Sequence, residues 1–192
     1  VLGVEVRWVP LAWSDFYPAV DDGRVDAIWC GQGMTDARRA QVDFTAPYAI
    51  FDESLVVGAG VDASGPDDLR GMRIGAIAAS TNMALAETFA GVETVAFPGT
   101  ERVFEEMVEA TRTGAIDGFV DDDVVMVPLD DDPALRLAFT LPTRNRWGIA
   151  VTKGNDALRE ALDAALAATI ADGTLEAAWR RTIPWLPFPL PE

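Results

Sequence analysis

Apolar and polar residues alternate over residues 4–8, where Val4, Val6 and Trp8 share one side, and this pattern predicts a strand. Residues 14–22 have helical character and end at Gly23, and residues 25–29 predict a second strand. A strand, helix and strand in this order typically form a right-handed crossover between parallel strands. The first fifty residues are therefore expected to contain one α/β unit.

The same order of elements recurs further along the chain. Strands are predicted at residues 73–77, 92–96 and 116–120, and a helix at residues 82–89. Thr100 is predicted to cap another helix, whose apolar face carries four residues: Val103, Phe104, Met107 and Val108. A second α/β unit follows from this repetition.

Two extended segments, at residues 51–61 and 147–151, flank the second unit, and two helices at residues 156–171 and 174–181 follow. If these helices pack on the first unit, the chain crosses twice between two lobes. The expected fold is therefore α/β and two-lobed with a two-strand hinge. Lobe 1 would comprise residues 1–51 and 152–192, and lobe 2 residues 52–151.

The composition narrows the possible functions. The 192 residues carry a formal charge of −16, which argues against nucleic-acid binding, because phosphate recognition needs clustered Lys and Arg. The chain has no histidine, and Cys30 is its single cysteine, so the usual zinc, haem, Ser-His and disulfide chemistries are absent. Carboxylate-only catalysis and carboxylate-bound calcium or magnesium stay open. No apolar run reaches the roughly 20 residues of a membrane helix.

The most informative segment, GQGMTDARRAQVDFTAPY at residues 31–48, places Arg38 on a short helix after a glycine-rich turn. A guanidinium pairs with a carboxylate through two parallel hydrogen bonds, so Arg38 is a candidate for binding a small carboxylate. The alternative is a surface salt bridge to Asp36 or Asp43. The neighbouring Arg39 is expected to be solvated.

The glycines before that helix are further candidates. Gly31 and Gly33 leave room for a ligand to approach the main chain closely, although a plain turn explains either glycine equally well. Cys30, just before them, either lines the pocket or is a buried core thiol.

Six motifs in order resemble the family 3 extracellular solute-binding proteins, the amino-acid receptors of ABC importers. The resemblance covers nearly the whole chain. The motifs are GRVDA at 23–27, the segment at 31–48, LRGMRIG at 69–75, AST at 79–81, GAID at 114–117 leading to Asp122, and WGIAV at 147–151.

This resemblance implies roles for individual residues. Arg38 matches the position that binds the α-carboxylate of the ligand. Gly33 departs from the family, because a Ser or Thr hydroxyl usually contacts the carboxylate there. Ser80 and Thr81 match a turn whose free amides favour an anion, so Thr81 is expected to hold the same carboxylate from lobe 2; ordinary helix capping is the alternative.

Two further positions carry over from the family. Asp122, eight residues after Gly114, matches the ammonium-binding aspartate, and a carboxylate at the carboxyl end of a strand points into the crevice where α/β proteins bind ligands. A solvated acidic loop or a weak calcium site is the alternative reading. Trp13 matches an aromatic position against the ligand side chain, with a core role in the first helix as the alternative.

The resemblance further implies a periplasmic-binding-protein type 2 fold that closes on a free amino acid about its hinge. The implied partners are the permease subunits of an ABC transporter, and no cofactor or metal is expected. The implied location is extracytoplasmic, either the periplasm or a lipoprotein on the outer cell surface. Relatives begin with a strand and a helix ahead of residue 1, so lobe 1 is expected to lack its opening strand and helix.

Two other functions fit the same scaffold. A few relatives resemble cyclohexadienyl or arogenate dehydratases, and this chain has carboxylates that could act as the acid. A ligand-sensing input domain of a larger receptor is the second alternative.

Overall fold

The computed structural model describes residues 1–190, which form two compact units. Unit 1 comprises Val1–Phe51 together with the chain from Arg144 onward, and unit 2 comprises Asp52–Thr143. The chain passes from one unit to the other within strand β3 (Ala49–Gly58) and again within strand β7 (Leu135–Trp147). The lobe boundaries predicted from the sequence, after residues 51 and 151, stay a prediction.

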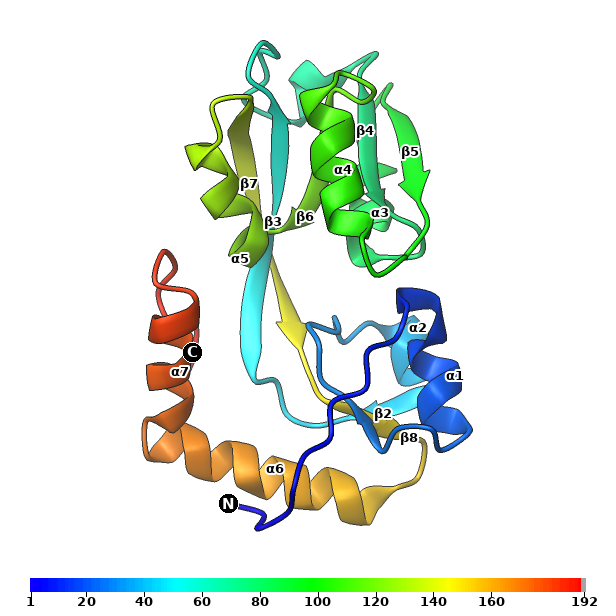
Figure 1. The fold of residues 1–192 in the computed structure, drawn as a ribbon, viewed down its shortest axis with the longest axis vertical. Coiled ribbons are helices and arrows are strands. Elements are labelled where there is room, and N and C mark those ends of the chain that lie inside the picture. Colours follow the sequence, from blue (N-terminus) through cyan, green and yellow to red (C-terminus); the bar gives the residue numbers. More distant parts are fainter. Residues whose placement is uncertain (191–192) are drawn as a thin grey trace. The chain divides into compact units, whose positions relative to one another are not determined.

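Unit 1 is built around a small antiparallel sheet with the strand order β1-β8-β2, of which Figure 1 labels β8 and β2. Its core cluster consists of Val20, Ile28, Val42, Phe44 and Ala150. The elements are η1 (Trp13–Asp15), α1 (Phe16–Asp21), β1 (Ala27–Ile28), α2 (Asp36–Arg39), β2 (Val42–Phe44), β8 (Ala150–Thr152), α6 (Asp156–Ala171) and α7 (Thr174–Thr182).

The parallel crossover predicted for the first fifty residues is wrong. Residues 4–8 form no strand, and Val4, Val6 and Trp8 are 67%, 62% and 71% exposed. A strand requires a neighbour for its backbone hydrogen bonds, and β1 pairs instead with β8, antiparallel and from the far end of the chain. Local alternation predicted an extended segment here, but pairing between distant segments decided the sheet.

Unit 2 contains a five-stranded mixed sheet with the order β5-β4-β6-β3-β7. Strand β4 is parallel to β5 and β6, as the predicted α/β unit requires, whereas β3 is antiparallel to β6. The remaining elements are η2 (Pro66–Leu69), β4 (Arg73–Ile77), α3 (Thr81–Ala86), β5 (Glu93–Phe97), α4 (Val103–Arg112), β6 (Gly118–Asp122), α5 (Asp123–Met126) and η3 (Val127–Asp131).

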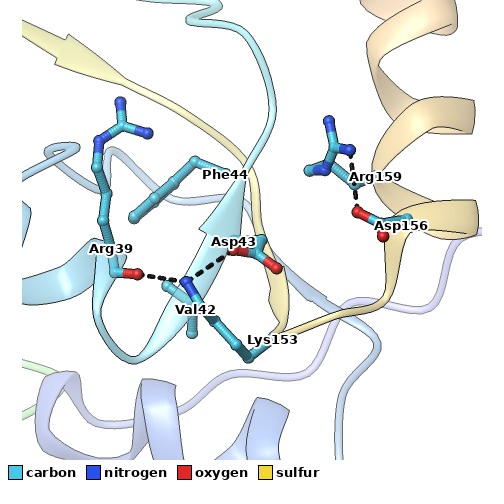
Figure 2. A pocket seen from close by; sticks show the side chains of 7 residues that line it. All are labelled: Arg39, Val42, Asp43, Phe44, Lys153, Asp156 and Arg159. Atoms are coloured by element: carbon cyan, nitrogen blue, oxygen red, sulfur yellow. Dashed lines mark hydrogen bonds and ion pairs between the residues drawn. The ribbon is translucent and has the colours of Figure 1, made fainter.

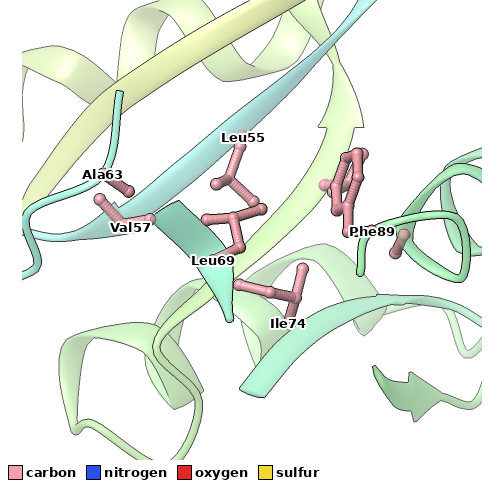
Figure 3. Packing of buried hydrophobic residues seen from close by; sticks show 8 residues of the cluster. Leu55, Val57, Ala63, Leu69, Ile74 and Phe89 are labelled. Carbon is pink, nitrogen blue, oxygen red and sulfur yellow. The ribbon is translucent and has the colours of Figure 1, made fainter. Parts of the chain in front are cut away.

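The sheet of unit 2 is buried on both faces. Successive residues of β3 point to opposite sides, so Leu55 and Val57 belong to one core cluster and Val56 to the other. Figure 3 shows the first cluster, in which Leu55 and Val57 lie close to Leu69 and Ile74. A strand covered on both faces reads as a continuous apolar run, which explains why residues 51–61 showed no helical periodicity.

Several predicted elements agree closely with the structure. The strand at 73–77 and the helix at 156–171 have the predicted bounds, and the other helices shift by a few residues. Thr100 is not the cap of α4, which has Arg102 at that position; instead the Thr100 hydroxyl accepts a hydrogen bond from the Arg102 amide at 3.2 Å. Strand β2 and most of β7 were not predicted.

Candidate functional site

Arg38 lies on helix α2 in unit 1 and is only 7% exposed. Its backbone amide donates a hydrogen bond of 3.3 Å to the hydroxyl of Thr35, the residue that caps the start of the helix. Its guanidinium donates through Nη1 to the carbonyl oxygen of Gly33 at 3.0 Å. The cap and this hydrogen bond together hold a cationic group in a buried position.

No ion pair joins Arg38 to a carboxylate within residues 1–190. Asp43 is one of the two partners considered from the sequence. It forms an ion pair with Lys153 instead, with Nζ of Lys153 2.9 Å from Oδ1 of Asp43. The surface-salt-bridge alternative for Arg38 is therefore wrong. A buried cation without an anionic partner is costly, so an anion that reached Arg38 would be bound favourably.

Trp13 supports Arg38 from a different element. The Cζ atom of Arg38 lies 5.3 Å from the centroid of the Trp13 ring, within the range of a cation–π contact. Trp13 in turn contacts Phe16 with ring centroids 5.4 Å apart. The structure thus places two sequence-predicted site residues together, with Trp13 against the guanidinium.

The predicted glycines lie in the loop that leads to α2. Gly31 has a φ of +72°, and a Cβ added to it would lie 3.4 Å from the Trp147 ring. Its backbone amide donates to the Tyr48 hydroxyl at 2.9 Å, and Gly33 forms a bridge with Trp147. The conformation and the close approach both explain why glycine occupies residue 31.

Cys30 is exposed as a residue, so the buried-core interpretation of this thiol is wrong. Protein atoms around its sulfur nevertheless raise the pKa of the Cys30 thiol to about 11 by desolvation, so the group stays uncharged at neutral pH.

Two neighbours of Arg38 were missed by the sequence reasoning. Gln32 is fully buried and accepts a hydrogen bond from the Tyr17 hydroxyl at 2.5 Å. The positive charge of Arg38 acts on Tyr17, whose pKa is raised mainly by desolvation and lowered in part by Arg38. A glutamine between two glycines gave the only local signal of this arrangement, and the sequence did not show that it would be buried.

The candidates of unit 2 gather where helix α3 meets strand β6. The Ser80 hydroxyl caps α3 by accepting from the Met83 amide at 3.0 Å, and Thr81 is the first residue of that helix. The side-chain amide of Asn82 donates to Oδ1 of Asp122 at 3.0 Å. Ser80 therefore has a capping role in the structure, and Asp122 is held in place by the residue that follows Thr81.

Asp122 belongs to a group of acidic residues that the sequence reasoning only partly recognised. Burial and the nearby Asp121 charge raise the pKa of Asp122 well above its usual range. Desolvation likewise raises the pKa of Asp121 to about 6 and that of Glu53 to about 7, and a hydrogen bond from Thr81 partly opposes the shift of Glu53. Glu53 was missed because β3 reads as an apolar strand around it.

A separate hollow of about 410 Å³ lies on unit 1 (Figure 2). Two of its three cations are paired with carboxylates, because Lys153 contacts Asp43 at 2.9 Å and Arg159 contacts Asp156 at 3.0 Å. Arg39 lines this hollow with Cζ 5.8 Å from the Phe44 ring, and Arg38 does not line it. The third cation, Arg39, is exposed to solvent, whereas Arg38 is buried, so the hollow lacks the desolvated cation that distinguishes the surroundings of Arg38.

Across residues 1–190, no three or more Cys, Asp or Glu side chains are arranged to hold a metal ion. In the same part of the chain, no helix combines the length and the apolar character that crossing a membrane requires.

Comparison with known proteins gives a consistent set of relatives. Residues 1–182 match the family model described as bacterial extracellular solute-binding proteins, family 3. The chain is 29% identical over 182 residues to the L-cystine-binding protein TcyJ of Escherichia coli (strain K12), covering 92% of this chain and 66% of that protein. It thus spans slightly less than two thirds of that relative.

Other amino-acid-binding proteins are similar to this chain in sequence or in fold. The ABC transporter arginine-binding protein 1 of Escherichia coli (strain K12) is 34% identical over 173 residues, covering 86% of this chain and 69% of that protein. Among solved structures, an ancestral arginine-binding protein bound to arginine matches with a TM-score of 0.86 and 29% identity, covering 94% of this chain and 81% of that chain. The two-lobed type 2 fold predicted from the sequence is thereby confirmed.

Proposed function

The chain belongs to the family 3 bacterial extracellular solute-binding proteins, and on that premise we propose that it binds a free amino acid. The observation that carries the proposal is the buried guanidinium of Arg38, which has no carboxylate partner among residues 1–190. A ligand carboxylate supplies the missing anion, and the planar donor fork of arginine suits it.

The named ligands of the relatives support this proposal. Relatives of the chain are named as binding proteins for L-cystine, arginine, histidine and glutamine. These compounds differ in their side chains and share an α-carboxylate and an α-ammonium group. The relatives are named as binding proteins and not as enzymes, so binding without covalent chemistry is the proposed activity.

The proposal assigns a role to residues in each unit, taken separately. Arg38 of unit 1 is proposed to bind the α-carboxylate, with the Trp13 ring and the Gly33 carbonyl holding the guanidinium. Asp122 of unit 2, oriented by Asn82, accepts the ammonium. The role of Thr81 toward the carboxylate stays a prediction, since the residue hydrogen-bonds to Glu53.

The proposed partners follow from the family. The relatives include components of ABC transporters, so we propose that this chain delivers its amino acid to the permease subunits of such an importer. The proposed location is outside the cytoplasm, in the periplasm or anchored as a lipoprotein on the outer surface.

A thermal-shift screen of the twenty amino acids, followed by calorimetry, tests the proposal. At least one amino acid should raise the melting temperature, since a ligand at about 100 times its Kd stabilises the folded state by about 2.7 kcal/mol. Arg38→Ala should abolish the shift while the circular dichroism spectrum stays that of the wild type. Arg39→Ala is the matched control, because Arg39 is an exposed neighbour on the same helix and should leave binding intact.

Two results would contradict this proposal. One is a wild-type protein whose melting temperature no amino acid changes. The other is an Arg38→Ala variant that binds an amino acid with wild-type affinity.

A further inference from the structure

One segment of unit 1 carries apolar side chains that stay open to solvent. Val4, Val6 and Trp8 are all more than half exposed, and they alternate with Glu5 and Arg7. In an extended chain successive side chains point to opposite sides, so the three apolar residues share one side and the two charged residues the other. In Figure 1 the segment is the dark blue trace near the N-terminus, outside any helix or strand. The segment therefore has the pattern of a strand without a sheet.

The backbone of this segment is unpaired. Within residues 1–190, neither a hydrogen bond nor an ion pair involves residues 2–11. Gly3 has a φ of +67°, which is not a strand conformation, and Pro10 has no amide hydrogen to donate. Residues 4–8 are therefore the stretch whose free amides and carbonyls can pair with another strand along its edge.

A second copy of the same segment supplies complementary charges. When two copies pair antiparallel with Val6 opposite Val6, Glu5 of each copy lies directly opposite Arg7 of the other. On the other face Val4 lies opposite Trp8, so apolar side chains meet apolar side chains. Opposite charges and apolar pairs directly across two strands both stabilise a sheet.

Other alignments of the two copies lose this match. Centring the antiparallel pair on residue 5 or on residue 7 sets like charges opposite each other, and so does parallel pairing in register. A shift by one residue brings charged side chains onto the apolar face of the other copy. The antiparallel register centred on Val6 therefore pairs both charges of each copy.

We propose that residues 4–8 are an interaction surface through which two copies of this chain pair as antiparallel strands about a two-fold axis. The paired strands form a ribbon with the apolar side chains on one face and the charged side chains on the other. Because each copy uses the same surface, the contact closes on itself and gives a dimer instead of a filament. This dimer goes beyond the proposed function and is independent of amino-acid binding through Arg38.

The dimer should be weak. A two-stranded ribbon is marginally stable on its own in water, so we expect a Kd of about 10–100 µM. Two other occupants compete for the same segment, a lipid surface and a strand of a different protein. The exposed ring of Trp8 suits either of them, but a second copy also accounts for the placement of Glu5 and Arg7 about Val6.

Sedimentation velocity over a range of protein concentrations measures the association. The wild type should pass from monomer to dimer as the concentration rises. Glu5→Arg and Arg7→Glu each set like charges opposite each other, and each alone should weaken the dimer about tenfold or more. Both residues are exposed and lack partners within residues 1–190, so neither change should alter folding, which circular dichroism checks.

A mixture of the two variants makes the test specific to this pairing. The Glu5→Arg protein carries two positive side chains on the charged face and the Arg7→Glu protein two negative ones, so every charge pair of the mixed dimer is favourable. The mixed dimer should form with a Kd within about threefold of the wild type. General attraction between the two proteins does not explain such a result, because the formal charge of −16 changes by two and stays strongly negative in both.

Glu105→Arg is the matched control. It makes the same change of charge as Glu5→Arg on the exposed side of α4 and should leave dimerisation unchanged. Hydrogen exchange at high protein concentration gives a second measurement, in which alternate amides of residues 4–8 should become protected as the dimer forms.

Three results would contradict this dimer. One is a wild type that stays monomeric at about 1 mM; binding of that monomer to phosphatidylcholine vesicles would assign the segment to a lipid surface, and its failure to bind them would leave a strand of a different protein. Another is a dimer that Glu5→Arg and Arg7→Glu form as tightly as the wild type. The third is a mixture of the two variants that associates no better than either variant alone.

Discussion

The guanidinium of Arg38 lies over the indole ring of Trp13, with Cζ 5.3 Å from the ring centroid. The two residues come from different elements, η1 and α2, and are separated by strand β1 in the chain. The ring covers one side of the cation, and the carbonyl of Gly33 receives one of its donors. Trp13 therefore holds Arg38 in the orientation that the proposed function requires.

Removing this ring should weaken ligand binding through Arg38. Trp13→Leu loses a cation–π contact of about 0.5–2 kcal/mol, so we expect affinity to fall roughly 3- to 30-fold in calorimetry. Trp13→Phe retains an aromatic face and should lose less affinity than Trp13→Leu. Equal losses in the two variants would show that the aromatic ring does not act on Arg38.

The stability of the protein should depend on the protonation of Glu53. Desolvation raises the pKa of Glu53 to about 7, above the ordinary value of about 4.3, and the acidic groups Asp52, Asp121 and Asp122 surround it. Between these values the folded state binds more protons than the unfolded state, so the free energy of unfolding falls as the pH rises through this range. At pH values below this range, Glu53 is protonated in both states, and its favourable contribution to the free energy of unfolding is fully retained.

Glu53→Gln should therefore stabilise the protein at pH 8 and have little effect at pH 4. The gain at pH 8 should be on the order of 2 kcal/mol, or roughly 4–8 °C in melting temperature for a chain of this size. Thermal unfolding of both proteins at the two pH values, without added amino acid, measures the difference. A gain of equal size at pH 4 and pH 8 would contradict a buried charge as its cause.

Gly118 of β6 has no room for a side chain. A Cβ at this position would lie 2.6 Å from the carbonyl oxygen of Val56 and 2.8 Å from Cγ1 of Val57, on the adjacent strand β3. Gly118→Ala should therefore destabilise the protein by about 1–3 kcal/mol in chemical denaturation, because the strands must separate locally.

Gly60 is the matched control for this substitution. It is exposed, has no atom within 4 Å of an added Cβ, and does not have a positive φ. Gly60→Ala should change the free energy of unfolding by less than about 0.5 kcal/mol. If both variants had the same stability, close packing would not explain glycine at residue 118.

Much of the secondary structure could be predicted from the local pattern of apolar and polar residues in the sequence. The apolar spacing over residues 156–171 predicts α6 with its observed bounds, and the short apolar run at 73–77 predicts β4. Both signals are local, since one comes from helical periodicity and the other from a buried parallel strand. Strand β2 was missed because it has three residues and is stabilised by β8, more than a hundred residues away.

The chemistry of the candidate site follows the same division. From the chain alone, Arg38 and Asp122 could be proposed, because a guanidinium after a glycine-rich turn and a carboxylate at the end of a strand are recognisable locally. Three features could not be predicted from the chain alone. They are the burial of Arg38 without a carboxylate partner, the ring of Trp13 over it, and the position of Glu53 opposite Asp122. Each depends on packing or strand register between distant segments, and β-strand register is set by the whole sheet.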